Sequence, residues 1–128
     1  MVTERSDDGK SPVLFAGDLN VGPGLGEENF EVIAKDLKLK NAFLELHPFE
    51  KQKKDALLVS WDRLNPLVKN GKYPNDPSAL IDHVLYRNAK NGSFTPKSCS
   101  IEERDNASGL QAPLSDHYAV MCELEIKN

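Results

Sequence analysis

The chain is poor in the residues that mark several common protein classes. Its 128 residues include one tryptophan, two methionines and two cysteines, Cys99 and Cys122. Two cysteines at this distance match no zinc-binding or redox spacing. We favour two separate thiols on strands, where cysteine packs as a small hydrophobe, over the disulfide that a secreted protein would allow.

Long hydrophobic runs and an excess of positive charge are also missing. The apolar run at residues 13–16 is far too short to cross a membrane. The net charge is -4 and the pI about 5.4, without a basic patch, which disfavours a nucleic-acid binder. The cluster Lys51, Lys53 and Lys54 is typical of a solvated loop. With 39% hydrophobic and 28% charged residues, and a mean hydropathy of -0.50, the composition is that of a globular protein.

The residue pattern predicts one α+β unit with more strand than helix. Residues 1–11 are a polar lead-in, and a single domain occupies residues 12–128. Phe30, Ile33, Ala34 and Leu37 fall on one face of a helix predicted over residues 27–37. Strands are predicted at 12–17 (fully buried), 57–61, 80–87, 93–102 and 118–126, loops at 47–56, 62–79 and 103–116, and residues 40–46 are of uncertain type.

Polar residues stand at the ends of three of these predicted strands. Residues 17–20 read Gly-Asp-Leu-Asn, residues 81–83 read Ile-Asp-His, and residues 115–117 read Ser-Asp-His. Each motif alone has an ordinary structural explanation, such as a turn, a buried acid bound by backbone amides or a structural histidine. The three motifs in this order are much more specific than any one of them.

The combination resembles the endonuclease/exonuclease/phosphatase superfamily. Residues 13–20 look like that family's Gly-Asp-x-Asn strand end, residues 81–85 like its Ile-Asp-Tyr/His strand, and residues 114–120 like its terminal Ser-Asp-His motif. The resemblance covers about residues 12–126. It implies half of a four-layer α/β-sandwich of the DNase I-like fold, from a metal-dependent phosphodiester hydrolase.

Two shorter segments resemble one branch of that superfamily. Residues 60–62 (Ser-Trp-Asp) and 65–67 (Asn-Pro-Leu) look most like the neutral sphingomyelinases. This resemblance implies a phospholipid substrate such as sphingomyelin and, through it, contact with a membrane surface. The alternatives are a nuclease or inositol-phosphate phosphatase of the same superfamily, or a catalytically silent binding module on the same fold. The acidic pI disfavours nucleic acid as the substrate.

His117 and Asp82 are the expected catalytic pair. The unperturbed pKa of histidine lies near neutral, so His117 is suited to take a proton from water as a general base. A general-base histidine needs a fixed tautomer, which a carboxylate accepting from its other ring nitrogen supplies. The resemblance gives that role to Asp82. We therefore expect Asp82 to lie within hydrogen-bonding distance of His117.

Asp18, Asn20 and Asp116 are expected to handle the phosphate and a metal ion. Asp18 and Asn20 are two residues apart just past a strand, so their side chains can share one side. Asn20 can donate its amide to a phosphate oxygen, while Asp18 is suited to act near the water, near the leaving group or on a metal. Asp116 is the expected ligand of Mg²⁺ or another divalent cation, and its alternative role is to cap the turn before the last strand.

Five other residues carry weaker expectations. Trp61, Asp62 and Asn65 are expected to line a substrate cleft, although Trp61 is equally suited to the core. His83 is interpreted as a wall residue of the site, and His47 as incidental.

The family's metal-ligand glutamate has no counterpart here. In the family it lies on a strand before the first motif, together with an asparagine and a histidine, whereas Glu4, Asp7 and Asp8 sit on no strand pattern. We therefore expect a half-domain that is inactive alone. Val13, Phe15 and the final strand should share one sheet whose apolar face is covered by the missing N-terminal half of the domain or by a second copy.

Overall fold

The computed structural model describes residues 9–52, 58–102 and 113–128. These residues form an α+β fold with three short helices and two antiparallel sheets. The predicted lead-in up to residue 8, residues 53–57 and residues 103–112 lie outside the described ranges. The elements in chain order are β1 (Val13–Asp18), α1 (Glu27–Asp36), β2 (Lys40–Asn41), α2 (Ala42–Leu46), the 3₁₀ helix η2 (Phe49–Lys51), α3 (Pro66–Lys69), β3 (Asp82–Arg87), β4 (Ser93–Glu102) and β5 (Ala119–Lys127).

Helix α1 confirms the prediction made from its apolar spacing. Glu27 and Glu28 occupy the first turn, where the helix dipole favours negative charge. Phe30 is the buried residue of the helix and packs against Leu85 of β3. The helix ends where Lys38 takes a left-handed conformation with φ 53°, which stops the helical hydrogen-bond pattern.

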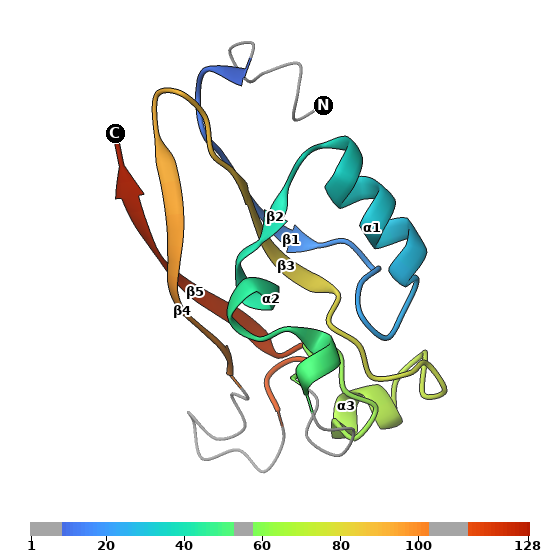
Figure 1. Ribbon diagram of the computed structural model, residues 1–128. Coiled ribbons are helices and arrows are strands. Elements are labelled where there is room, and N and C mark those ends of the chain that lie inside the picture. The colour runs from blue at the N-terminus through green and yellow to red at the C-terminus, as the bar shows by residue number, and fades with distance from the viewer. Residues whose placement is uncertain (1–8, 53–57, 103–112) are drawn as a thin grey trace.

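Strand β3 is the centre of the three-stranded sheet, with β1 on one side and β2 on the other. Because successive side chains of a strand point to opposite faces, the register separates two sets of residues. Phe15 lies opposite Leu85 on one face, and Ala16 lies opposite Val84 on the other. Helix α1 covers the face of Phe15, and the β4–β5 pair lies on the opposite side of the sheet (Figure 1).

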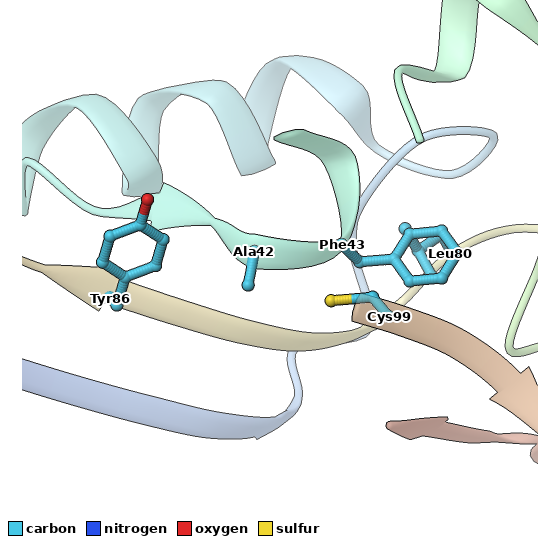
Figure 2. Close-up of a cluster of buried hydrophobic side chains, with 5 residues drawn as sticks. All are labelled: Ala42, Phe43, Leu80, Tyr86 and Cys99. Atoms are coloured by element: carbon cyan, nitrogen blue, oxygen red, sulfur yellow. The ribbon is translucent and has the colours of Figure 1, made fainter. Parts of the chain in front are cut away.

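A cluster of buried side chains joins the two sheets. Ala42 and Phe43 come from α2, Leu80 lies two residues before the start of β3, Tyr86 belongs to β3 and Cys99 to β4 (Figure 2). Ala42, Phe43 and Leu80 are fully buried. The short helix α2 therefore packs between the β4–β5 pair and the three-stranded sheet and joins them. This helix lies in the segment 40–46, whose type could not be predicted from the residue pattern.

Two predictions about strand burial are wrong. The first strand is not fully buried, because β1 pairs only with β3 among the described strands and leaves Leu14 50% exposed and Ala16 exposed. Nor does it share a sheet with the final strand, since β5 pairs with β4. Helix α1 covers the face of the sheet that carries Phe15. The exposed apolar side chain at the open edge of β1 is therefore Leu14, on the other face.

Two other predicted segments are irregular. The strand predicted at 57–61 reduces, in its described part, to isolated bridges of Trp61 with Ala79 and His117. The excursion at 62–79 is confirmed as largely irregular, but it contains α3, whose N-cap Asn65 accepts a hydrogen bond from the backbone N–H of Leu67.

The expectation of two separate thiols is also wrong. Cys99 and Cys122 form a disulfide. They are direct partners in the β4–β5 register, with Cα atoms 4.1 Å apart, so strand pairing itself brings the two sulfurs together. Sequence spacing alone carried no sign of this pairing, because the register depends on which strands become neighbours.

Reduction of this disulfide is expected to lower the free energy of unfolding by about 3 kcal/mol, since it releases a constraint on the unfolded chain. Urea denaturation of the oxidised and the reduced protein measures the difference. The double variant Cys99→Ala/Cys122→Ala is the control and should not respond to reductant. Equal unfolding midpoints for oxidised and reduced wild type would contradict the expectation.

Candidate functional site

Three strand ends bring the main candidate residues together. Asp18 ends β1, Asp82 begins β3, and His117 lies just before β5. One ligand atom from each of these three side chains lies within 4.8 Å of the other two. These residues are far apart in the sequence, so their convergence is a product of the fold.

The expected contact between Asp82 and His117 is confirmed. The Oδ2 atom of Asp82 lies 2.7 Å from Nδ1 of His117. An ionised carboxylate only accepts, so Nδ1–H of His117 donates, and in the neutral imidazole Nε2 keeps its lone pair. Nε2 makes no hydrogen bond to a described residue, and the His117 side chain is 26% exposed. The free nitrogen can therefore accept a proton from a molecule in solution.

Asp18 adds a second carboxylate beside this pair. It lies directly opposite Asp82 in the β1–β3 register. Like charges opposite each other destabilise a sheet unless a positive group compensates them. One Asp18 oxygen accepts from the backbone N–H of Asn20 at 2.7 Å, and Asn20 has φ 54°, so the Asp-x-Asn sequence does form a turn. Two opposed acids at a strand end make a place suited to a cation.

A buried serine positions the Asp82–His117 pair. The Oγ atom of Ser60 accepts hydrogen bonds from the backbone N–H groups of Ile81 and Asp82, each at 3.1 Å. Its carbonyl oxygen accepts from the N–H of Tyr118 at 2.7 Å. Ser60 thus ties the start of β3 to the segment of His117. No residue pattern indicated this role, because a serine in an irregular segment has many ordinary explanations.

The residues expected to line a cleft divide into two kinds. Trp61 is 8% exposed, packs with Val68 and Ala79, and places its ring edge-on to His117 with centroids 5.1 Å apart. It therefore belongs to the core and also borders the site. Asp62 is occupied by hydrogen bonds from the backbone N–H of Leu64 and the hydroxyl of Ser78, outside the cavities beside the histidine.

Asn65 is likewise engaged within the protein. It is 1% exposed. Its Nδ2 donates to the carbonyl oxygens of Ser115 at 3.0 Å and Asp116 at 3.3 Å. Such burial leaves no access for a substrate, so Asn65 positions the Ser-Asp-His segment by holding its backbone.

Asp116 lies near the pair but outside the Asp18–Asp82–His117 group. Its side chain is exposed and faces a cavity of about 500 Å³ that His117 and Asn20 also line. A second cavity, of about 410 Å³, is lined by Asp82 and His117 on the side of β5. The histidine therefore stands between two openings, with Asn20 and Asp116 on one of them.

His83 has a structural position, as its interpretation as a wall residue implied. It is 2% exposed and stacks on Phe30 with centroids 4.4 Å apart. Its Nε2–H donates to the carbonyl oxygen of Val21, and its Nδ1 accepts from the amide of Asn41, both at 2.8 Å. Gly22 is required beneath the ring, since a Cβ there would lie 2.9 Å from it and 1.9 Å from the carbonyl oxygen of Leu80. The imidazole is thus held in its neutral form.

The His83 environment predicts an acid-sensitive fold. Burial lowers the pKa of His83 below its ordinary value of 6.5, against the opposing effects of the Val21 carbonyl and of Asp82 and Asp18. Protonation then favours the unfolded state, so the His83 contribution is complete above about pH 6.5 and falls as the pH drops below that value. Thermal unfolding from pH 8 to pH 5 should show this loss, and His83→Gln should flatten it. An unchanged pH dependence in His83→Gln would contradict the assignment.

His47 packs away from this site. Its Nε2 lies 2.8 Å from the carbonyl oxygen of Cys99, and its ring contacts Phe43. It therefore helps to join α2 to β4, in keeping with its interpretation as incidental to catalysis.

Two residues near the site were missed from the sequence. Tyr73 and Asp76 both line the cavity of about 500 Å³ that contains His117. They come from the irregular excursion, where proline, asparagine and glycine suggested turns but gave no indication of which side chains turn inward. The length of that excursion was the one available signal.

The donor set fits a hard divalent cation in its chemistry. Asp18 and Asp82 offer carboxylate oxygens, which Mg²⁺ prefers, and Asp116 offers another from the cavity of about 500 Å³ that His117 also lines. One Asp82 oxygen is engaged by His117 and one Asp18 oxygen by the N–H of Asn20, which leaves the second oxygen of each of these two carboxylates for a cation and its water ligands.

The comparisons with known proteins assign this chain to no family. No family model matches the chain, and searches of the curated proteins and of the solved structures find no match. The fold and site therefore define a small α+β protein with an Asp–Asp–His group at three strand ends.

Proposed function

We propose that this chain is the C-terminal half of a metal-dependent phosphodiesterase with the DNase I-like sandwich of the endonuclease/exonuclease/phosphatase superfamily. The observation that carries the proposal is the contact of 2.7 Å between Asp82 and Nδ1 of His117, with Asp18 in the same group and no hydrogen bond from Nε2 to a described residue. Support also comes from the order of the three motifs, each of which supplies one member of this group.

The residues of the chain divide the chemistry among them. Nε2 of His117 accepts a proton from water, and the oxygen of that water attacks phosphorus. The ester bond from phosphorus to the leaving oxygen breaks, and the departing alkoxide takes a proton from solvent. Asp82 holds the imidazole in the tautomer with the proton on Nδ1 and stabilises the imidazolium that forms. Asn20 donates its amide N–H to a phosphate oxygen. Asp18 stands close enough to this group to orient the water.

A divalent cation, Mg²⁺ in our proposal, would be held by Asp18 and Asp116, with the outer oxygen of Asp82 as a further donor. When bound, it supplies positive charge that neutralises the phosphate and stabilises the leaving oxygen. The family's glutamate would complete the ligand set from outside this chain.

The proposed substrate is a phospholipid such as sphingomyelin, reached at a membrane surface. The acidic pI and the segments 60–62 and 65–67 support this choice. Among the described residues, no helix is long and apolar enough to cross a membrane. A nuclease, an inositol-phosphate phosphatase and a silent binding module on the same fold remain the alternatives.

A substrate panel distinguishes these functions. The full-length protein that carries this chain should hydrolyse sphingomyelin in mixed vesicles with Mg²⁺ faster than duplex DNA or an inositol polyphosphate. Preferential cleavage of DNA or of the inositol phosphate would reassign the substrate. No cleavage of any member, nor of the generic diester bis(p-nitrophenyl) phosphate, would favour the silent module.

The open edge of β1 is the proposed contact for the missing half of the domain. Leu14 is 50% exposed there, and Ala16 borders the cavity of about 410 Å³ beside Asp82. A large apolar side chain left in water forgoes about 1.5–3 kcal/mol. We propose that the N-terminal half covers this edge, and that a second copy of the chain does so when that half is absent.

The isolated 128-residue chain is therefore expected to self-associate and to be inactive. Light scattering measures the first property, and hydrolysis of bis(p-nitrophenyl) phosphate with Mg²⁺ the second. Leu14→Glu should shift the chain toward monomer, because it places a charge on the open edge. A monomeric wild type with metal-dependent activity would contradict the half-domain proposal.

A further inference from the structure

The turn between β3 and β4 carries a short sequence that the proposed catalysis does not use. Residues 91–93 read Asn-Gly-Ser. An asparagine, a residue other than proline and then a serine or threonine form the acceptor sequence for N-linked glycans. This three-residue pattern arises often by chance, so the case depends on the position of Asn91 in the fold.

Asn91 lies at the exposed tip of the turn. The N–H of Ala89 donates to the carbonyl oxygen of Gly92 at 3.0 Å, and the N–H of Gly92 donates to that of Ala89 at 3.3 Å, so Asn91 stands between the two paired residues. Its backbone N–H donates to the carbonyl oxygen of Lys10 at 3.1 Å. Its side-chain amide makes no hydrogen bond to a described residue, and the residue is exposed. The amide nitrogen is therefore open to modification.

The neighbours of this asparagine fix the turn in place. The Oδ1 atom of Asn88 accepts a hydrogen bond from the backbone N–H of Phe94 at 2.7 Å. Gly92 is buried, and a Cβ on it would lie 3.1 Å from the ring of Pro12 and 3.2 Å from the carbonyl oxygen of Lys127. The middle residue of the acceptor sequence thus faces the protein, while the asparagine before it faces solvent.

The disulfide between Cys99 and Cys122 is a second and independent indication. Disulfides form and persist in the oxidising lumen of the secretory pathway and outside the cell, and they are rare in the cytosol. N-linked glycans are attached in proteins that pass through the same lumen. Strand β4 begins at Ser93 of the acceptor sequence and contains Cys99, so one strand carries both indications.

The acceptor lies at the end of the sheet away from the Asp–Asp–His group. Strand β3 begins at Asp82 and ends at Arg87, and the turn follows it. A strand of this length spans about 20 Å. Figure 1 shows the β3–β4 turn at the end of the sheet opposite α3. A glycan on this turn would leave the openings beside His117 uncovered.

We propose that Asn91 carries an N-linked glycan. In the transfer, Nδ2 of Asn91 forms a bond to C1 of the first sugar of a lipid-linked pyrophosphate oligosaccharide. The bond between that C1 and the pyrophosphate oxygen breaks, the amide gives up one proton, and the lipid pyrophosphate leaves. Ser93 supplies the hydroxyl that the acceptor sequence requires. The bulky, hydrated glycan keeps this end of the sheet in solvent.

Peptide mapping of the full-length protein, purified from the organism that makes it, tests the proposal. Peptide-N-glycosidase F releases the glycan and leaves aspartate in place of the asparagine, so digestion in heavy-oxygen water marks the site. We expect heavy oxygen at position 91 only after this digestion. An unmodified Asn91 would overturn the proposal. Aspartate there before digestion, without heavy oxygen, would also overturn it, since it would mean deamidation of the Asn-Gly pair.

Matched variants locate the glycan on a gel. Asn91→Gln and Ser93→Ala should each remove one glycan, with the same gain in mobility that the glycosidase produces, whereas Ser93→Thr should keep it. Asn70→Gln is the control, because Asn70 is also exposed and precedes a glycine, but Lys72 follows in place of a hydroxyl residue. No mobility change in either Asn91→Gln or Ser93→Ala would contradict the assignment.

A second acceptor sequence, Asn-Ala-Ser at residues 106–108, lies outside the described residues. Asn106→Gln should leave the glycan on Asn91 in place, and loss of all glycan in that variant would overturn the proposal. Alkylation of the natural protein checks the compartment. Cys99 and Cys122 should resist alkylation until they are reduced, and free thiols would contradict the shared oxidising lumen.

Discussion

Replacing His117 by alanine is expected to lower phosphodiester hydrolysis by the full-length protein about 10²–10⁴-fold, and more if the catalytic residues act as a unit. The reason is the geometry of its two nitrogens. Nδ1 is committed to Asp82 at 2.7 Å, while Nε2 borders the cavities and makes no hydrogen bond to a described residue. Removing the ring removes the proton acceptor without opening the main core. Initial rates with bis(p-nitrophenyl) phosphate and Mg²⁺ measure the loss.

Chemical rescue separates loss of a base from loss of structure. The space left by the ring of His117 should admit free imidazole, so added imidazole should restore part of the rate in His117→Ala. Circular dichroism of the variant should match wild type, because its Trp61 neighbour keeps its own packing against Val68 and Ala79. Near-wild-type turnover in His117→Ala would remove this residue from the mechanism.

Asp82→Asn is expected to have a similarly large effect, about 10²–10⁴-fold on kcat, through the tautomer of His117. An asparagine amide donates to Nδ1, which moves the ring proton to Nε2 and removes the lone pair that accepts from water. The hydrogen bonds that the backbone N–H groups of Ile81 and Asp82 donate to Oγ of Ser60 are unaffected, so the strand should keep its place. Rates of Asp82→Asn against the exposed-acid control Asp36→Asn measure the effect.

A different result would change the role of Asp82. If Asp82→Asn retained full kcat but needed much more Mg²⁺, Asp82 would act as a metal ligand with no part in orienting the histidine. If Asp82→Asn changed neither kcat nor the Mg²⁺ concentration needed, the contact of 2.7 Å between Asp82 and His117 would have only a structural role. The ionic-ligand and tautomer roles are thus separated by one titration of rate against Mg²⁺.

Local patterns predicted the elements whose cause is local. The apolar spacing around Phe30 gave helix α1, and β4 follows the predicted strand 93–102 residue for residue. The resemblance carried by the three motifs also implied that Asp82 and His117 would meet, and their contact confirms it. For α1 and β4 the signal lies within about ten residues, where side-chain periodicity reflects burial directly.

Features that depend on which segments of the chain become neighbours in space were not predictable in the same way. The exposure of Leu14 follows from β1 being an edge strand, and the disulfide follows from the β4–β5 register. The positions of Tyr73 and Asp76 follow from a turn in an irregular segment that packs beside His117. Each is set by long-range pairing or by loop packing, for which a single sequence carries no periodic signal.

Removing and restoring Mg²⁺ tests whether the protein is a metal-dependent phosphodiesterase. The account predicts that the full-length protein hydrolyses bis(p-nitrophenyl) phosphate with Mg²⁺, stops when the ion is chelated, and recovers when Mg²⁺ is restored. It also predicts that Asp18→Asn raises the Mg²⁺ concentration needed for half the full rate, because Asp18 offers carboxylate oxygen within the group of 4.8 Å. Hydrolysis that continues after chelation, or no hydrolysis at any Mg²⁺ concentration, would contradict a metal-dependent phosphodiesterase.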